Sequence, residues 1–393
     1  MSAAAAMDGA GQSSTEQSLR ARRTIVLAGG GSGGHLSPGL AIAERLIEVD
    51  PTARPLFLCS DRAIDANMLG EARADFRPIA AVGLRRTPGG LWRFLRAYWR
   101  GRSQSMRILR DEHVEHVVSL GGFVTGPVTS AARALGIPIT LVNLDATPGK
   151  ANRVVARRAH RVLSAVETPG IPQFAEAIVG MPIRRSALAP AGRAECRARL
   201  GIRGTQPVLL ITGASQGAGS LNTFMLEFAR AHRALLQHWH ILHLAGARSD
   251  PSADELSRGY AELGLEASVR PFMHEMGLAW GAAELALSRA GANSVAEAEV
   301  NRVPTVFVPY PYHHDLHQVA NAKPLVDAGA AALAYDKLTP GENMKTIGRA
   351  LEPLLGDGSL RDAMEAALAA RGNMDAALAI ARTLLNRHKP RGK

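Results

Sequence analysis

Cysteine is scarce in this chain, since its 393 residues contain only Cys59 and Cys196. Two cysteines cannot form a disulfide framework, so we expect a protein of a reducing compartment, the cytoplasm by default. Long apolar runs are lacking as well. The longest uncharged stretch, Thr24 to Ala43, is interrupted by glycines, a proline and a histidine, and we expect no membrane-spanning segment. Residues 1–22 lack the apolar core of a secretory signal and are expected to form a disordered tail.

Aromatic residues make up 5% and charged residues 21% of the chain, while hydrophobic residues reach 46%. These proportions are those of ordinary globular proteins and exclude collagen-like chains and overall disorder. At roughly 150 residues per domain, the length predicts two or three domains.

Acidic residues are absent from Arg85 to Arg110, a segment that contains eight arginines in a chain of net charge +11. Large apolar side chains alternate with these arginines, which is typical of a helix in a membrane interface. The residues predicted to contact an anionic membrane surface are Trp92, Arg93, Phe94, Leu95, Arg96, Trp99 and Arg100. A solvated charged face is the alternative. We expect no nucleic acid partner, because no nucleic-acid-binding module accompanies the run.

Short β-branched runs alternate with longer segments of helical period, the pattern of parallel strands joined by crossover helices. Strands are predicted at 24–28, 55–59, 79–83, 116–120, 139–142 and 161–165, and in a second series at 207–212, 240–245, 268–272, 285–288, 305–308 and 331–334. Two α/β domains are therefore expected at 23–182 and 207–360, with a linker at 183–206 and a helical C-terminal region with a basic tail at 361–393. Ligands of such sheets bind in the loops after the strands.

The first glycine-rich loop, GGGSGGH from Gly29 to His35, follows the first predicted strand and opens a helix. Its spacing matches G-x-G-x-x-G, in which glycines let the backbone approach an anion at a helix N-terminus. An NAD-dependent oxidoreductase requires an acidic residue about 20 positions further on. Asp61 matches this position only imperfectly, because it follows Gly34 by 27 residues. His35 is a candidate base, because an imidazole accepts a hydroxyl proton near neutral pH. A tight turn without a ligand and a capping histidine are the alternatives.

A second loop of this kind, GASQGAGSLN from Gly213 to Asn222, follows the first strand of the second series. Ser215 and the amides around Gln216 and Gly217 are candidates to hold a pyrophosphate at a helix N-terminus. An ordinary strand-to-helix turn is the alternative.

Glu297 has two interpretations of equal weight. It accepts hydrogen bonds from the hydroxyls of a ribose, or it forms a capping box with Ser294. Asp315 and Gln318 are spaced as a similar cap. The nearby histidines, His313, His314 and His317, lack a carboxylate or cysteine at ligand spacing, so no metal site is predicted.

Together these segments resemble the MurG family of N-acetylglucosaminyltransferases, which convert lipid I to lipid II in peptidoglycan synthesis. The resemblance covers roughly Thr24 to Ala334 and includes six segments in the family's order: GGGSGGHLSPGLAIA, SLGGFVTGP, GMPIR, GASQGAGSLN, SRAGANSVAE and DLHQVANA. It implies an α/β fold of two Rossmann-like doubly wound domains facing a cleft, the GT-B architecture. The acceptor is then expected on the N-terminal domain and the UDP-sugar mainly on the C-terminal one.

The resemblance also implies the site residues. His35 is expected near the reacting groups, Arg184 and Ser215 near the diphosphate, Met273 at the uracil, Glu297 on the ribose, and Gln318 with Asn321 near the sugar. The full donor set is Ser32, Gly33, Gly34, Arg184, Ser215, Gln216, Met273, Ala292, Asn293, Ser294, Glu297, Gln318 and Asn321. The acceptor set is Gly121, Gly122, Thr125, Asn143 and Asp145, and the catalytic candidates are His35 and Asp145.

The sequence departs from the family pattern mainly on the acceptor side. Where the family usually reads H-E-Q-N-x-x-x-G, this chain reads VNLDATPG, so that Asn143 replaces a glutamate and Asp145 an asparagine. His274 and Glu275 stand where an acidic pair is commoner, and Ser32 replaces a threonine.

The resemblance predicts an inverting transfer of N-acetylglucosamine from UDP-N-acetylglucosamine to the 4-hydroxyl of a polyprenyl-diphosphate-linked muramyl sugar, without metal or cofactor. The enzyme is expected as a peripheral protein on the cytoplasmic face of the inner membrane. A related GT-B transferase with another acceptor is the first alternative. An NAD-dependent oxidoreductase is less favoured, because it gives no role to the second loop or to Glu297.

Overall fold

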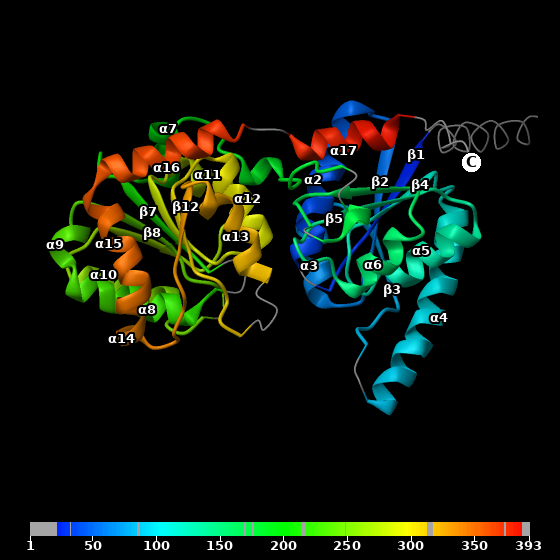
Figure 1. Ribbon diagram of the computed structural model, residues 1–393, viewed down its shortest axis with the longest axis horizontal. Helices are drawn as coiled ribbons and strands as arrows, with labels where there is room; N and C mark the ends of the chain where they lie inside the picture. Colours follow the sequence, from blue (N-terminus) through cyan, green and yellow to red (C-terminus); the bar gives the residue numbers. More distant parts are fainter. Residues whose placement is uncertain are drawn as a thin grey trace, which may run out of the picture. The chain divides into compact units, whose positions relative to one another are not determined.

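The computed structural model describes residues 22–31, 33–84, 87–168, 170–174, 177–213, 217–247, 249–312, 317–372 and 375–386. The chain divides into two compact units, which we treat separately. The first unit comprises residues 1–182 and 375–393, and the second comprises residues 183–374. Each unit is a parallel sheet between helices (Figure 1).

The sheet of the first unit has the strand order β3-β2-β1-β4-β5-β6, with every described pair parallel. This is the order of a doubly wound nucleotide-binding fold. Its strands are β1 (Arg23–Ala28), β2 (Ala53–Ser60), β3 (Asp75–Ile79), β4 (His116–Ser119), β5 (Ile139–Asn143) and β6 (Arg161–Ser164). Its helices are α2 (Gly33–Val49), α3 (Ala63–Glu71), α4 (Pro88–Asp111), α5 (Thr125–Ala134), α6 (Lys150–Ala156) and α17 (Ala376–Leu385), with a short 3-10 turn η1 (Pro172–Phe174).

Both faces of this first sheet are buried, as a sheet between two helical layers requires. Along β1, Ile25 and Leu27 belong to the core on the side of α2 and α17, whereas Val26 and Ala28 belong to the core that includes residues of α5. Because both faces of such a strand are buried, its sequence is a continuous run of apolar residues and does not alternate between apolar and polar residues.

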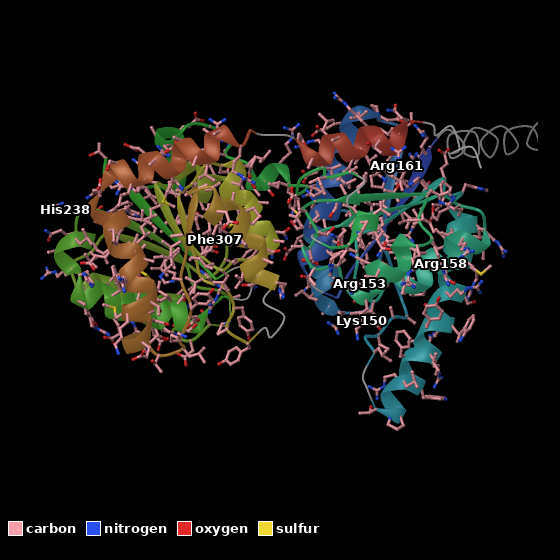
Figure 2. All side chains as sticks on the ribbon, in the orientation of Figure 1. Lys150, Arg153, Arg158, Arg161, His238 and Phe307 are labelled. Atoms are coloured by element: carbon pink, nitrogen blue, oxygen red, sulfur yellow. The ribbon has the colours of Figure 1, made fainter. Side chains whose placement is uncertain are left out.

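The second unit repeats the same topology, with the strand order β12-β11-β10-β7-β8-β9. Its strands are β7 (Val208–Thr212), β8 (His240–Leu244), β9 (Ala267–Arg270), β10 (Leu285–Ser288), β11 (Thr305–Phe307) and β12 (Ala331–Leu333). Phe307 of β11 is fully buried in the core of this sheet (Figure 2). The predicted fold class, two Rossmann-like doubly wound α/β domains, is confirmed.

The helices of the second unit cover both faces of its sheet. They are α7 (Arg193–Leu200), α8 (Gly219–Ala231), α9 (Arg233–Leu236), α10 (Ala253–Glu262), α11 (Met276–Ala282), α12 (Ala292–Val300), α13 (His317–Asp327), α14 (Pro340–Asn343), α15 (Arg349–Gly356) and α16 (Gly358–Ala370). A 3-10 turn η2 (Arg185–Ala187) and a π-helical turn η3 (Met344–Gly348) complete the unit.

The structure differs from the sequence analysis at three places. The third strand is Asp75–Ile79 rather than 79–83, because this charged edge segment pairs with β2. Residues of the expected linker belong to the second unit, where α7 packs against α11. The last helix, α17, belongs to the first unit, where it packs against α2.

A buried ion pair fixes α17 on the first unit. The side chain of Arg45, in α2, is almost completely buried, and its Nε lies 2.7 Å from a carboxylate oxygen of Asp375, which caps α17. A buried arginine is tolerated in a core only when it is paired. Among the described helices, none is long and apolar enough to cross a bilayer.

Candidate active site

The predicted motifs gather at one point of each sheet. β1 pairs with β4 in the first unit and β7 with β10 in the second, and at these pairs the strand order changes direction. A doubly wound sheet opens a crevice for ligands at the carboxyl ends of such strands. The loops that leave these four strands are the ones that carry GGGSGGH, SLGGFVTGP, GASQGAGSLN and SRAGANSVAE.

His35 lies in the first turn of α2, against the loop that follows β4. A Cβ atom on Gly121 would lie 3.0 Å from Nε2 of His35, and one on Gly122 would lie 3.6 Å from its Nδ1. Both glycines have positive φ, so the turn needs glycine for its conformation as well as for the imidazole. Burial lowers the pKa of His35, and Asp145 and Asp65 partly offset this. The imidazole is therefore neutral at pH 7 and able to accept a proton.

Asp65, at the start of α3, organises the first glycine-rich loop. Its buried carboxylate accepts hydrogen bonds from the N–H of Gly31 (2.8 Å), the N–H of Ser60 (3.1 Å) and the hydroxyl of Ser60 (2.6 Å). A Cβ atom on Gly30 would lie 2.4 Å from this carboxylate. Part of the anion-binding capacity of the loop is thus taken by the protein itself. Asp61, which the sequence analysis considered only as an imperfect match to the acidic residue of an NAD-binding fold, is not the carboxylate that holds this loop.

Asn143, at the end of β5, is buried and forms a hydrogen bond with the backbone of the loop that carries Asp145. Its side-chain nitrogen donates to the carbonyl of Asp145 (2.8 Å) and to the hydroxyl of Ser164 (3.0 Å), and its oxygen accepts from Asn152 (3.2 Å). The hydroxyl of Thr125 likewise donates to a backbone carbonyl, that of Gly122, at 2.9 Å. Contact of these predicted acceptor residues with a ligand stays a prediction.

Glu297 lies in α12, where no described side chain caps the helix that begins at Ala292. The capping box with Ser294 is therefore not formed. Instead, the carboxylate of Glu297 accepts a hydrogen bond of 2.9 Å from the indole N–H of Trp280. Burial raises the pKa of Glu297 to about 7, although the Trp280 hydrogen bond and the charge of Arg184 both lower it. Near pH 7, a carboxylate of this kind changes its charge when a ligand adds or removes hydrogen bonds.

The segment that carries Arg184 is fixed between the helices α11 and α12. Asn301, directly after α12, accepts a hydrogen bond from the N–H of Ala189 (2.7 Å) and donates one to the carbonyl of Ala187 (2.8 Å). Gly277 of α11 packs on the other side, where an added Cβ atom would lie 2.0 Å from a carbonyl oxygen of the segment. The segment that follows Arg184 is therefore held against α12, the helix that carries Glu297.

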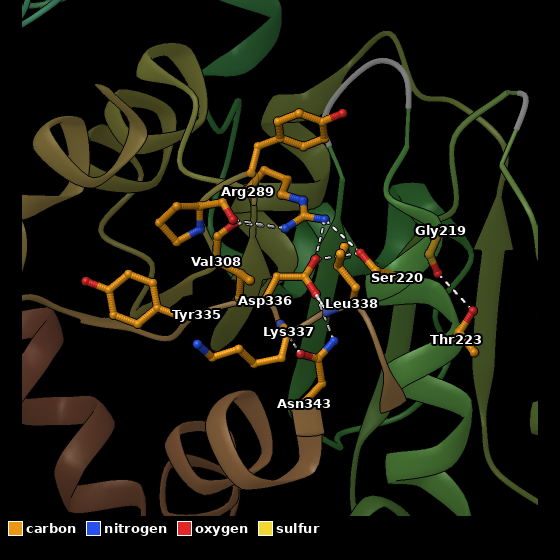
Figure 3. Close-up of polar contacts among 12 residues, drawn as sticks. Gly219, Ser220, Thr223, Arg289, Val308, Tyr335, Asp336, Lys337, Leu338 and Asn343 are labelled. Carbon is orange, nitrogen blue, oxygen red and sulfur yellow. Dashed lines mark hydrogen bonds and ion pairs between the residues drawn. The ribbon is translucent and has the colours of Figure 1, made fainter. Parts of the chain in front are cut away.

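Arg289, in the loop after β10, forms a buried ion pair with Asp336, after β12, that sequence reasoning missed (Figure 3). Its guanidinium donates to a carboxylate oxygen of Asp336 (2.8 Å) and to the hydroxyl of Ser220 (2.9 Å). The other oxygen of Asp336 accepts hydrogen bonds from Asn343 (2.9 Å) and the N–H of Leu338 (2.7 Å). Ser220 lies in the first turn of α8, so the network fixes the helix that follows the second glycine-rich loop.

Packing explains two glycines of that second loop. Gly217 has positive φ, and an added Cβ atom would lie 2.4 Å from the carbonyl oxygen of Ala245. A Cβ atom on Gly213 would lie 2.4 Å from the N–H nitrogen of Ala218. The glycines are thus required by the turn itself, and a ligand at this turn stays a prediction.

The other predicted donor residues are divided between the two units. Gln318 of α13 accepts a hydrogen bond from the N–H of Tyr310 at 2.8 Å. Asn321, in α13, is buried next to the start of α12. Its side-chain oxygen accepts a hydrogen bond from the N–H of Ala292, and its nitrogen donates one to the carbonyl of His317, each at 3.3 Å. The remaining ones are Gly33 and Gly34 in α2, Ala292, Asn293 and Ser294 in the first turn of α12, and Met273, buried after β9.

Several predicted residues lie outside the described part of the chain: Ser32, Ser215, Gln216, His313, His314 and Asp315. Within the described part, no cluster of three or more histidine, cysteine or acidic side chains is arranged to bind a metal ion.

The arginine-rich segment forms α4, which extends beyond the rest of the first unit at its N-terminal end (Figure 1). Trp92 and Trp99 are 64% and 62% exposed, and Leu91 and Leu95 are exposed as well. Phe94 is half-buried. Arg96 lies over the ring of Trp92, with its guanidinium carbon 5.5 Å from the ring centre. Exposed apolar side chains grouped on one helix are typical of a surface that contacts a partner or a membrane.

Comparison with known families decides the relationship. The model of the glycosyltransferase family 28 N-terminal domain matches residues 25–164, and that of the family 28 C-terminal domain matches residues 208–370. The chain belongs to glycosyltransferase family 28. The family 28 domains follow the two sheets closely, so each matched domain corresponds to one doubly wound unit.

Individual members of family 28 align with nearly the whole chain. The UDP-N-acetylglucosamine--N-acetylmuramyl-(pentapeptide) pyrophosphoryl-undecaprenol N-acetylglucosamine transferase of Mycolicibacterium vanbaalenii is 35% identical, covering 92% of this chain and 89% of its own length. The enzyme of that name from Mycolicibacterium smegmatis is 35% identical and covers 92% and 93%. MurG of Acinetobacter baumannii, a solved structure, is 25% identical with a TM-score of 0.71 over 93% of this chain and 100% of its own. The resemblance to MurG and the assignment as a glycosyltransferase are confirmed.

Proposed function

We infer that the chain transfers N-acetylglucosamine from UDP-N-acetylglucosamine to the lipid-linked muramyl-pentapeptide acceptor, the step from lipid I to lipid II in peptidoglycan synthesis. The observation that carries this inference is the 35% identity, over 92% of the chain, to transferases named for this reaction. The motifs of both units lie at the strand ends where doubly wound folds bind ligands. We assign no cofactor to the reaction.

His35 is the proposed general base. The acceptor's 4-hydroxyl oxygen attacks C1 of the sugar, its proton passes to the imidazole, and the bond from C1 to the diphosphate oxygen breaks, so that UDP leaves and the anomeric centre is inverted. The neutral state of His35 at pH 7 supports this role. Asp145 is the second candidate, because its charge acts on His35 and it lies in the altered acceptor segment.

The donor is assigned to the second unit. Glu297 accepts hydrogen bonds from the ribose hydroxyls, while Arg184 and the start of α8 stabilise the charge that develops on the leaving diphosphate. Ser215 and Gln216 are assigned to the diphosphate and Met273 to the uracil. Gln318 and Asn321 are assigned to the sugar, Asn321 through its hold on the first turn of α12.

The exposed face of α4 is the proposed contact with an anionic membrane surface. A polyprenyl-linked acceptor is reached at a bilayer, and exposed tryptophans beside arginines suit the interface between headgroups and acyl chains. About 1 kcal/mol per basic residue near an anionic surface makes the association reversible. The protein is accordingly assigned to the cytoplasmic face of the inner membrane as a peripheral enzyme.

The decisive experiment incubates the protein with UDP-N-acetylglucosamine and a lipid I analogue and follows both UDP release and the disaccharide product. The expected result is one disaccharide for each UDP released, with much less UDP released when the acceptor is omitted. Release of UDP with a different acceptor, but not with the lipid I analogue, would replace this function by that of a family 28 transferase with another acceptor. Absence of turnover with UDP-N-acetylglucosamine and every acceptor would contradict the donor assignment.

A further inference from the structure

Among the residues that the structure describes, Trp280 contacts Glu297 and belongs to none of the motifs quoted from the sequence. Its indole lies in α11, where residues Gly277 to Ala282 are all buried, and its side chain is completely buried. The indole N–H donates to Oε2 of Glu297 at 2.9 Å. A buried indole N–H needs an acceptor, and here the acceptor is a carboxylate, which makes the hydrogen bond stronger than a neutral one.

The hydrogen bond determines how the carboxylate can meet a ligand. An ionised carboxylate has about four acceptor positions on two oxygens. Trp280 occupies one of them on Oε2, which leaves Oε1 and the second position of Oε2. Two adjacent hydroxyls on one ribose require two acceptor positions held in a fixed plane. A rigid, buried donor behind the carboxylate provides such an orientation.

We propose that Trp280 is a positioning residue for the donor, holding the Glu297 carboxylate in the orientation that accepts the ribose hydroxyls of a uridine nucleotide. This inference deepens the proposed function, because it takes the ribose contact of Glu297 from it. Two further contacts hold the surrounding elements: Asn301 fixes the segment after Arg184 to α12, and Gly277 brings α11 against that segment. Arg184 is the charged group that acts on Glu297.

Trp280→Phe tests the proposal, because it removes the N–H donor and keeps an aromatic ring in the core. The matched control is Trp239→Phe. Trp239 is also buried in the second unit, and its indole N–H donates to the carbonyl of Leu355 at 3.3 Å, in the other core cluster. Both changes remove one buried hydrogen bond and part of a ring. Only Trp280→Phe is expected to alter donor binding.

The measurements are the dissociation constants of UDP and of 2′,3′-dideoxyuridine diphosphate, which lacks the ribose hydroxyls, together with KM and kcat. Trp280→Phe should weaken UDP binding and raise the donor KM about three- to tenfold at pH 7, with kcat within about twofold. Binding of the dideoxy compound should not change. The loss should disappear in a Glu297→Gln background, where the carboxylate that Trp280 orients is absent.

Each outcome separates the two proposals. If Glu297→Gln binds UDP as the native protein does, the ribose contact itself is wrong. If Glu297→Gln weakens UDP binding but Trp280→Phe does not, the ribose contact stands and the role of Trp280 is overturned. Equal losses for UDP and for the dideoxy compound, or additive losses in the double variant, also overturn it, since a merely structural tryptophan would produce them.

A second measurement keeps the test valid if Trp280→Phe folds poorly. In native protein with ¹⁵N-labelled tryptophan, the indole N–H signal of Trp280 should shift with pH, with a midpoint near 7, as Glu297 gains or loses its proton. The shift should vanish in Glu297→Gln and persist in Trp239→Phe. An indole signal of Trp280 that is the same in the native protein and in Glu297→Gln would overturn the proposal, because the hydrogen bond to the carboxylate would then be absent.

Discussion

Replacement of Glu297 by glutamine should stabilise the second unit at alkaline pH, even though it removes a proposed ligand-binding group. Burial raises the pKa of Glu297 from 4.5 to about 7. An acid whose pKa is higher in the folded than in the unfolded state gives stability that is fully present below the unfolded-state pKa and is lost as the pH rises through about 7. Glutamine resembles the protonated acid in shape and stays neutral, so it does not lose this stability.

The magnitude comes from the two pKa values. The interval between 4.5 and about 7 corresponds to at most about 3 kcal/mol at alkaline pH. Because Glu297 is partly exposed, solvent screening reduces this figure, and we expect a gain of about 1–3 kcal/mol. For a unit of this size, each kcal/mol raises the unfolding temperature by about 2–4 °C. The gain should grow from pH 5 to pH 7 and level off above pH 8.

The assay is thermal unfolding without ligand from pH 5 to pH 9, followed by near-ultraviolet circular dichroism and calorimetry. Glu255→Gln is the control, because hydrogen bonds from Ser252 lower the pKa of Glu255; this change should bring no gain at alkaline pH. A gain of Glu297→Gln that is the same at pH 5 and pH 9 would refute the reasoning, as would a loss at pH 9, since Glu297 would then be ionised in the fold without penalty.

The strands were predictable where a run of apolar residues is buried on both faces. The expected strand 24–28 corresponds to β1, Arg23–Ala28. β3 was missed because it is an edge strand of mixed composition, DFRPI, whose Asp75 and Arg77 form ion pairs with Arg54 and Glu112. Local hydrophobicity favoured the neighbouring residues 79–83, which leave the sheet after Ile79.

The placement of His35 and Glu297 in segments that follow strands was predictable from the spacing of those segments, and their contacts with a ligand stay predictions. The sequence did not reveal the roles of three other residues, Asp65, Trp280 and Asp336. Each makes its contact with a residue 17 to 47 positions away, and a local sequence pattern does not record such a contact. The assignment of α17 to the first unit was missed for a related reason. Its ion pair with Arg45 joins residues at opposite ends of the chain.

The remaining predictions concern both units. His35→Ala should lower turnover about 100-fold or more with nearly unchanged UDP binding; a greater loss in Asp145→Asn, measured by UDP release, would move the base to Asp145. Asp65→Asn should destabilise the first unit by about 1–3 kcal/mol, seen by calorimetry, and an unchanged transition would show that the glycine-rich loop does not need this carboxylate. Trp92→Ser with Trp99→Ser should weaken binding to anionic vesicles at unchanged charge; equal binding in a sedimentation assay would make the attraction purely electrostatic, and no binding by the native protein would exclude the membrane contact. Arg289→Met leaves the fully buried carboxylate of Asp336 without its cation, so it should destabilise the second unit by about 3–5 kcal/mol. Asp336→Asn added to Arg289→Met removes the stranded charge, and urea unfolding should therefore show a double variant less destabilised than the sum of the two single changes; strict additivity would mean that the two side chains do not stabilise the strand ends as a pair.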